Sequence, residues 1–233
     1  MSDATHPRFG SDEYRALGSL AITLLVMAAL LFPPAGTLAW DRGWWYLASF
    51  VVAILVAIVY IWRVDPELFA IRRKPQAGSK AWDLAFVAVT LTSMAAILPV
   101  AGLDYRFGWS RLSDGVVWLG YLIFAAGFWL TAWAQGVNRH FELTVRIQTD
   151  RGHKVIDAGP YATVRHPGYV GGVALGIGTA LALGSLVAVI PAVFCAVALA
   201  LRTLAEEATL SEELEGYTDY MHRVRFRWVP GIW

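Results

Sequence analysis

The run HPGYVGGVALGIGTALALGSLVAVIPAVFCAVALAL, residues 166–201, decides the fold of this chain. It contains no Asp, Glu, Lys or Arg over 36 residues. As one helix it would measure roughly 54 Å, whereas the hydrocarbon core of a bilayer is about 30 Å thick. Gly184-Ser185 lies near the middle of the run. We therefore expect a hairpin of two short helices.

Four further stretches are free of these charged residues, and each is long enough to cross a bilayer once: 16–40, 43–62, 84–103 and 115–138. With the hairpin, the pattern predicts an all-α, polytopic membrane protein of about six transmembrane helices. A hydrophobic fraction of 57% and a charged fraction of 16% agree with this class. The net charge of +1 gives no indication of a nucleic-acid partner.

The basic residues predict the orientation of these helices. In a six-helix topology both termini and the even-numbered loops share one side, and 16 of the 19 Lys and Arg residues fall there. Arg42, Arg106 and Arg111 lie on the other side. The positive-inside rule then places both termini in the cytoplasm of a multi-pass membrane protein. The acidic N-terminal segment is unlike a cleavable signal peptide, so we expect the first helix to stay as an anchor.

Polar residues gather in two regions, which divide the chain into transmembrane helices one to four (residues 1–137) and a C-terminal part (residues 138–233). This second part holds a connector too long for a simple turn, the hairpin and a cytoplasmic tail, and we expect one integrated domain. The connector either wraps a ligand or is a solvated basic loop. Arg202 and Glu206 are four residues apart and share a helix face, either as site residues or as a helix-end ion pair. The hairpin should return Arg202 and Glu206 to the same depth in the membrane as His166.

Several common site types are absent from the sequence. There is no GxGxxG after a strand, no P-loop, no HExxH and no GxSxG. The spacing of the histidines at 140, 153 and 166 does not suit metal ligands on one helix, so we expect no metal site. Cys195 is the only cysteine, which excludes an intrachain disulfide. At residues 223–228 basic and apolar side chains alternate, which indicates an extended segment that either lies on the membrane or closes the site.

Four motifs in the C-terminal part resemble the isoprenylcysteine carboxyl methyltransferase family of integral membrane enzymes, and phospholipid methyltransferases share much of the pattern. The motifs are Gly-x-Tyr at 159–161, Arg-His-Pro-x-Tyr-x-Gly at 165–171, Arg-x-x-x-Glu-Glu at 202–207 and Gly-Tyr-x-x-Tyr at 216–220. The resemblance covers residues 141–230. The first four helices match only in their hydrophobic character.

The resemblance implies a cofactor, S-adenosyl-L-methionine, and assigns residues to it. The cofactor-binding positions that it implies are Arg146, His153, Lys154, Val155, Ile156, Tyr161, His166, Pro167, Gly168, Tyr169, Glu206 and Glu207. Catalytic roles fall to Arg202, Glu206 and His166, with Arg202 facing the methyl acceptor. Arg146 stands where the prenylcysteine enzymes carry a Gln, a departure that bears on acceptor choice.

The chemistry of these residues suits such a ligand. A carboxylate can pair with a positive group or accept ribose hydroxyls, and tyrosine rings offer flat faces to adenine or a sulfonium. The planar fork of Arg202 suits a carboxylate acceptor because it binds two oxygens. We therefore expect a methyltransferase that acts on a lipidic or prenylated acceptor, first of all a prenylcysteine-like carboxylate.

Three alternatives remain open from the sequence. A phospholipid amine would also be a suitable acceptor, but it must first lose a proton to His166 or to a glutamate. An NADPH-dependent sterol-type reductase is the second alternative, since Arg146, Arg151 and Lys154 could hold a 2′-phosphate. The third is a non-enzymatic lipid carrier whose basic loop docks to headgroups. The sequence does not predict an oligomeric state.

Overall fold

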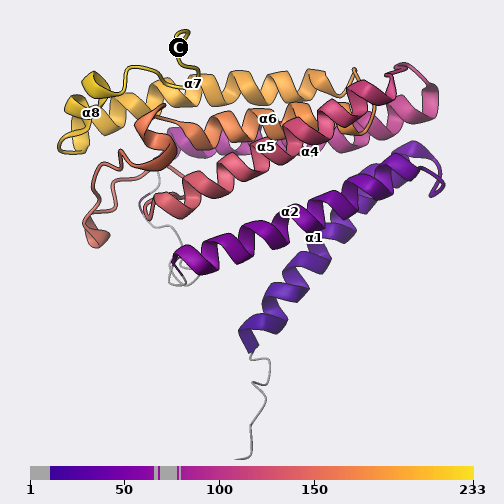
Figure 1. The fold of residues 1–233 in the computed structure, drawn as a ribbon, viewed down its shortest axis with the longest axis horizontal. Helices are drawn as coiled ribbons and strands as arrows, with labels where there is room; N and C mark the ends of the chain where they lie inside the picture. Colours follow the sequence, from indigo (N-terminus) through magenta and orange to yellow (C-terminus); the bar gives the residue numbers. More distant parts are fainter. Residues whose placement is uncertain (1–10, 66–67, 69–77, 79) are drawn as a thin grey trace, which may run out of the picture.

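The computed structural model describes residues 11–65, 68, 78 and 80–233, and helices dominate them (Figure 1). The α-helices are α1 (Ser11–Ala35), α2 (Asp41–Val64), α4 (Ala81–Phe107), α5 (Asp114–Val137), α6 (Pro167–Ala182), α7 (Val189–Glu213) and α8 (Tyr217–Arg223). Two short 3₁₀ turns, η1 (Thr149–Arg151) and η2 (Gly159–Ala162), lie between α5 and α6. These described parts of the chain contain no β-strand, so the predicted all-α class is confirmed there.

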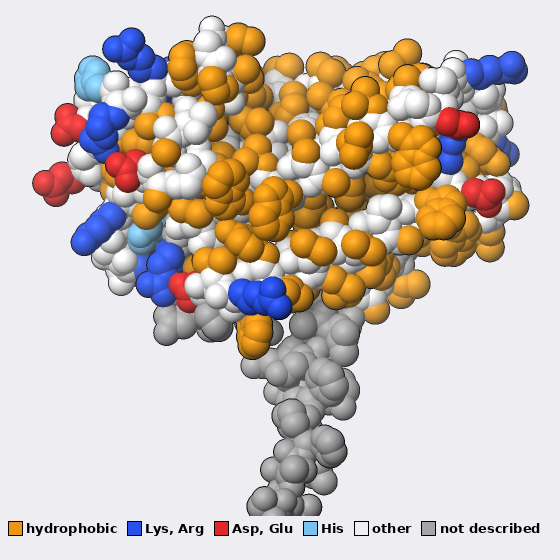
Figure 2. Space-filling view, in the orientation of Figure 1, with side chains coloured by type: hydrophobic (Ala, Val, Ile, Leu, Met, Phe, Trp, Pro, Cys, Tyr) orange, Lys and Arg blue, Asp and Glu red, His pale blue; other side chains and the backbone are white. Residues whose placement is uncertain are grey.

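Within the described residues, five helices are long and apolar enough to cross a membrane, namely α1, α2, α4, α5 and α7. The sixth expected span corresponds to α6, which has only 16 residues. At about 1.5 Å per residue it measures roughly 24 Å, less than the hydrocarbon thickness. Figure 2 shows hydrophobic side chains over the middle of the visible face and charged side chains at its two ends. This distribution is that of a multi-pass membrane protein.

The predicted hairpin is present, and a buried carboxylate holds its turn. Gly184 adopts a φ of +79°, in the left-handed region that favours glycine. The Asp104 carboxylate, 2% exposed, accepts hydrogen bonds from the Ser185 hydroxyl and from both the backbone N–H and the hydroxyl of Ser110. The turn is therefore fixed to the end of α4. The second helix of the hairpin, α7, continues beyond the apolar run and ends at Glu213.

Glycines let α5 and α6 pack closely. A Cβ atom added at Gly178 would lie 2.3 Å from the backbone nitrogen of Phe124. One added at Gly171 would lie 2.3 Å from the Thr131 hydroxyl oxygen. Small residues at helix interfaces allow such close approach in membranes. The close pairing of these two helices brings the end of α5 beside the beginning of α6.

The connector, η2, α8 and the C-terminal tail gather at one end of the helical bundle, while the N-terminal part of α1 extends away from it (Figure 1). The tail pairs with the beginning of the hairpin through its backbone. Arg165 and His166 donate their backbone N–H groups to the carbonyls of Phe226 and Arg227, each at 3.0 Å. The alternating tail segment thus packs against the start of α6.

Candidate functional site

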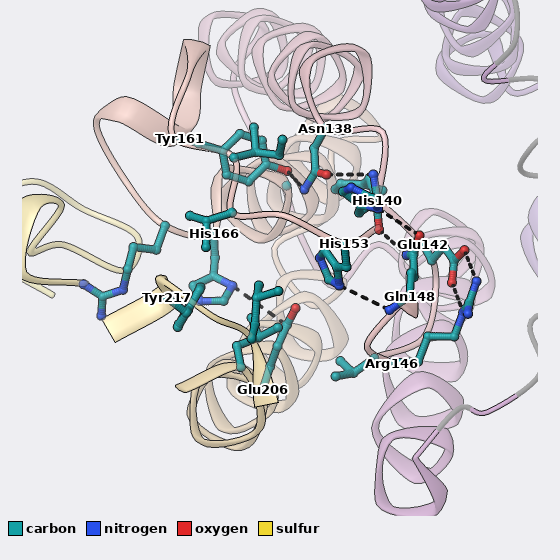
Figure 3. A pocket seen from close by; sticks show the side chains of 18 of the residues that line it. Asn138, His140, Glu142, Arg146, Gln148, His153, Tyr161, His166, Glu206 and Tyr217 are labelled. Atoms are coloured by element: carbon teal, nitrogen blue, oxygen red, sulfur yellow. Dashed lines mark hydrogen bonds and ion pairs between the residues drawn. The ribbon is translucent and has the colours of Figure 1, made fainter. Parts of the chain in front are cut away.

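A cavity that is partly open to solvent lies at this end of the bundle (Figure 3). Its walls come from the end of α5, the connector, η2, the start of α6, the polar end of α7 and α8.

Most of the residues expected at the site line this cavity. They are Arg146, His153, Lys154, Val155, Ile156, Tyr161, His166, Gly168, Tyr169, Arg202 and Glu206. Pro167 is instead buried as the first residue of α6, and Glu207 is buried, at 4% exposure, behind His166. Further lining residues were not anticipated from the sequence: Asn138, His140, Glu142 and Gln148. The unusual length of the connector was the only signal for them.

His166 and Glu206 both lie on the wall of the cavity, as the predicted hairpin requires. The distance between His166 Nδ1 and Glu206 Oε2 is 3.8 Å. The Tyr169 hydroxyl donates a hydrogen bond to the same carboxylate oxygen. The rings of His166 and Tyr169 stack with centroids 5.4 Å apart and planes inclined by 11°. Figure 3 shows His166, Glu206 and His153 around the same space.

Glu207 lies behind this wall and accepts hydrogen bonds from two arginines. Arg165 Nε lies 2.6 Å from Oε1, and Arg227 Nε lies 2.7 Å from Oε2. His166 Nε2 is 3.2 Å from Oε1. A buried carboxylate requires such compensation. Glu207 therefore joins α7 to the start of α6 and to the C-terminal tail.

Arg202 has a carboxylate partner within the protein. Its Nε and Nη2 atoms donate to the two carboxylate oxygens of Asp83 at 2.7 and 3.0 Å, and Nη2 also donates to the carbonyl of Leu143 at 2.6 Å. Asp83 is fully buried and also accepts the backbone N–H of Val145 at 2.7 Å. Sequence reasoning missed Asp83. As an acidic residue in the first turn of an apolar helix, it resembles an ordinary helix-dipole partner.

Two basic residues of the connector are paired as well. Arg146 donates to both oxygens of Glu142 at 2.8 and 3.1 Å and to Asp150 at 2.9 Å. The hydrogen bonds from Arg146 to Glu142 are the main cause that raises the pKa of Arg146. Arg151 donates to Glu142 at 3.1 Å. Arg146 and Arg151 are two of the three basic residues that could hold the 2′-phosphate of NADPH. Both are therefore already bound to the Glu142 carboxylate.

The two connector histidines form an uncharged wall of the cavity. The rings of His140 and His153 lie 4.4 Å apart, and the backbone N–H of Gln148 donates to His153 Nδ1 at 3.3 Å. Burial, and secondarily the adjacent His140, lowers the pKa of His153 to about 4. Burial also lowers the pKa of His140. Both rings are consequently neutral at pH 7.

The family model of phospholipid methyltransferases matches residues 116–215, which comprise most of α5, the connector, α6 and all of α7. Residues 116–215 therefore have the sequence pattern of the phospholipid methyltransferase family. The resemblance to membrane methyltransferases is thereby confirmed, and membership indicates a membrane methyltransferase that acts on lipid. No curated protein matches the chain.

The cavity of this phospholipid methyltransferase region has the side chains that the methyl donor of such enzymes would need. S-adenosylmethionine carries a sulfonium, an ammonium, a carboxylate and an adenine. Glu206, with 20% of its side chain exposed, offers a negative charge, and Lys154 offers a positive one. Tyr161 and Tyr169 supply aromatic faces. The residues present therefore fit the group.

Proposed function

We propose that this protein is an S-adenosylmethionine-dependent methyltransferase that methylates a membrane lipid. One observation carries the proposal: His166 and Glu206 stand 3.8 Å apart on the wall of a cavity that is lined mostly by the family-matching region. That cavity lies at the end of apolar helices, where a lipid headgroup can approach from the bilayer. The excess of basic residues in the loops at this end supports a cytoplasmic site.

We assign the binding of the methyl donor to the connector and to Glu206. Lys154 and the main chain of residues 153–156 would hold the carboxylate end, and Glu206 would balance a positive group or accept ribose hydroxyls. The donor supplies an electrophilic methyl group, and transfer occurs in line. The protein therefore contributes alignment and exclusion of water, and the connector and α8, which line the cavity, support both.

The structure bears on the choice between the two acceptors. The two-pronged fork of Arg202 favours a prenylcysteine-like carboxylate in the sequence, but in the structure Asp83 and Leu143 occupy its Nε and Nη2 atoms. Only Nη1 has no hydrogen-bond partner among the described residues. A phospholipid amine is supported by the family match and by the Glu206 carboxylate, which favours a cationic headgroup. We propose the phospholipid amine first and the carboxylate second.

Ligand titration of the purified, detergent-solubilised protein tests the function. We expect S-adenosylhomocysteine to bind, and we expect Glu206→Gln and His166→Ala to lose most of this binding while remaining folded. Glu212→Gln is the matched control, because Glu212 is exposed on the same helix. Binding of NADPH without S-adenosylhomocysteine would support the reductase instead. Binding of neither ligand would favour the lipid carrier.

A second assay separates the acceptors. Methyl transfer from labelled S-adenosylmethionine is measured into vesicles that contain phosphatidylethanolamine and, separately, into a farnesylated cysteine. We expect incorporation into the amine lipid. Incorporation only into the cysteine carboxylate would reverse the order of the two candidates while leaving the methyltransferase proposal intact.

A further inference from the structure

His166 lies between two carboxylates that contact different ring nitrogens. Nε2 is 3.2 Å from Glu207 Oε1, whereas Nδ1 is 3.8 Å from Glu206 Oε2. The residue is 7% exposed and lines the cavity. The stacked ring of Tyr169 restricts rotation of the imidazole. The two ring nitrogens are therefore in chemically distinct surroundings.

The surroundings of Glu207 determine which nitrogen carries the proton. Arg165 and Arg227 each donate to this carboxylate, and two adjacent guanidinium groups favour its ionised form. An ionised carboxylate only accepts hydrogen bonds. The 3.2 Å contact must therefore be Nε2–H of His166 donating to Glu207. In the neutral ring the lone pair then resides on Nδ1.

Nδ1 is available to a ligand. Among the described residues no N–H or O–H group donates to it, and its separation from Glu206 exceeds hydrogen-bond distance. Glu206 Oε2 already accepts the Tyr169 hydroxyl. Nδ1 therefore presents an unshared lone pair to an amine in the cavity, beside the Glu206 carboxylate, whose Oε1 can also accept a hydrogen bond. The tautomer of His166 could not be inferred from the sequence.

We propose that Glu207 is a positioning residue that holds His166 in the Nε2–H tautomer, so that Nδ1 accepts a proton from the ammonium group of the acceptor lipid. This inference rests on the proposed function with an amine acceptor. The ammonium N–H bond breaks, its proton joins Nδ1, and the nitrogen lone pair becomes free to take the methyl group. The resulting imidazolium lies between the Glu206 and Glu207 carboxylates, which stabilise it. Nδ1 later returns its proton to water through the open side of the cavity.

Nitrogen NMR of ¹⁵N-histidine-labelled protein tests the tautomer without donor or lipid. The chain has five histidines, and the His166→Gln spectrum identifies the signals of His166 by their absence. We expect a protonated Nε2 and a bare Nδ1 in the wild type at pH 7.5. The opposite tautomer in the wild type would overturn the proposal.

Variants at position 207 test the cause. Glu207→Gln should abolish the tautomer preference, and Glu212→Gln should leave it unchanged. If Glu207→Gln does not fold, Glu207→Asp serves instead. The shorter side chain keeps a negative charge for Arg165 and Arg227 but moves it away from the His166 ring. This variant should also weaken the preference for the Nε2–H tautomer. An unchanged tautomer in a folded Glu207 variant would contradict the role. S-adenosylhomocysteine binding on the same samples reports separately on the proposed function.

Discussion

Asp83→Ala removes one half of the ion pair that joins α4 to α7 beside the cavity. Asp83 is fully buried, and only 6% of the Arg202 side chain is exposed. The substitution deletes two hydrogen bonds from Arg202 and one from the backbone of Val145. Arg202 keeps its contact with the carbonyl of Leu143 and its cation–π contact with Tyr169.

The loss of stability follows from these contacts. Removal of one partner of a buried pair costs about 3–5 kcal/mol, because it leaves an uncompensated charge. The unpaired Val145 N–H adds about 1–3 kcal/mol. Because Arg202 lines the cavity, water can partly solvate its guanidinium and offset these terms. We expect Asp83→Ala to lower the free energy of unfolding by about 3–5 kcal/mol.

Reversible unfolding in mixed detergent micelles, followed by tryptophan fluorescence, measures this change. The double variant Asp83→Leu/Arg202→Met removes both charges, and replacement of a buried pair by apolar residues is often neutral. It should therefore be more stable than either single variant. A loss below about 1 kcal/mol in Asp83→Ala would refute the reasoning, since exposed ion pairs contribute no more than that. Additive losses in the double variant would equally refute it, because they would show no coupling.

Two further predictions concern the connector and the packing of α6. The pKa of His153 falls from 6.5 to about 4 on folding, so the folded state binds fewer protons between these pH values and stability should decrease as the pH falls through this window. Thermal melts at several pH values should show a smaller loss of stability at low pH for His153→Gln than for the wild type. An identical pH dependence of the two proteins would contradict this prediction. Gly178→Ala should destabilise the protein by about 1–3 kcal/mol through overpacking against Phe124, whereas Gly172→Ala, whose added Cβ would meet only Leu199 at 3.7 Å, should be tolerated. Equal melting temperatures for the two alanine variants would show that α5 and α6 do not pack this closely.

The sequence predicted the membrane class, the hairpin and most of the residues around the cavity. Hydropathy and length are local quantities, and the 36-residue apolar run cannot be one span. Its reversal near Gly184 then brings His166 to Glu206. The run also predicted two short helices, and α6, with 16 residues, is one of them, whereas α7 continues beyond the run to Glu213.

The partners of the buried charges were determined by the tertiary structure alone. Arg202 was expected to face a ligand; it lines the cavity, and it also pairs with Asp83, which lies 119 residues earlier in the chain. Glu207 was expected to contact the cofactor, but it binds Arg165 and Arg227 behind His166. A local pattern shows that a charge lies within apolar sequence and needs compensation. Which opposite charge supplies it depends on how distant helices pack, and no spacing along the chain encodes that.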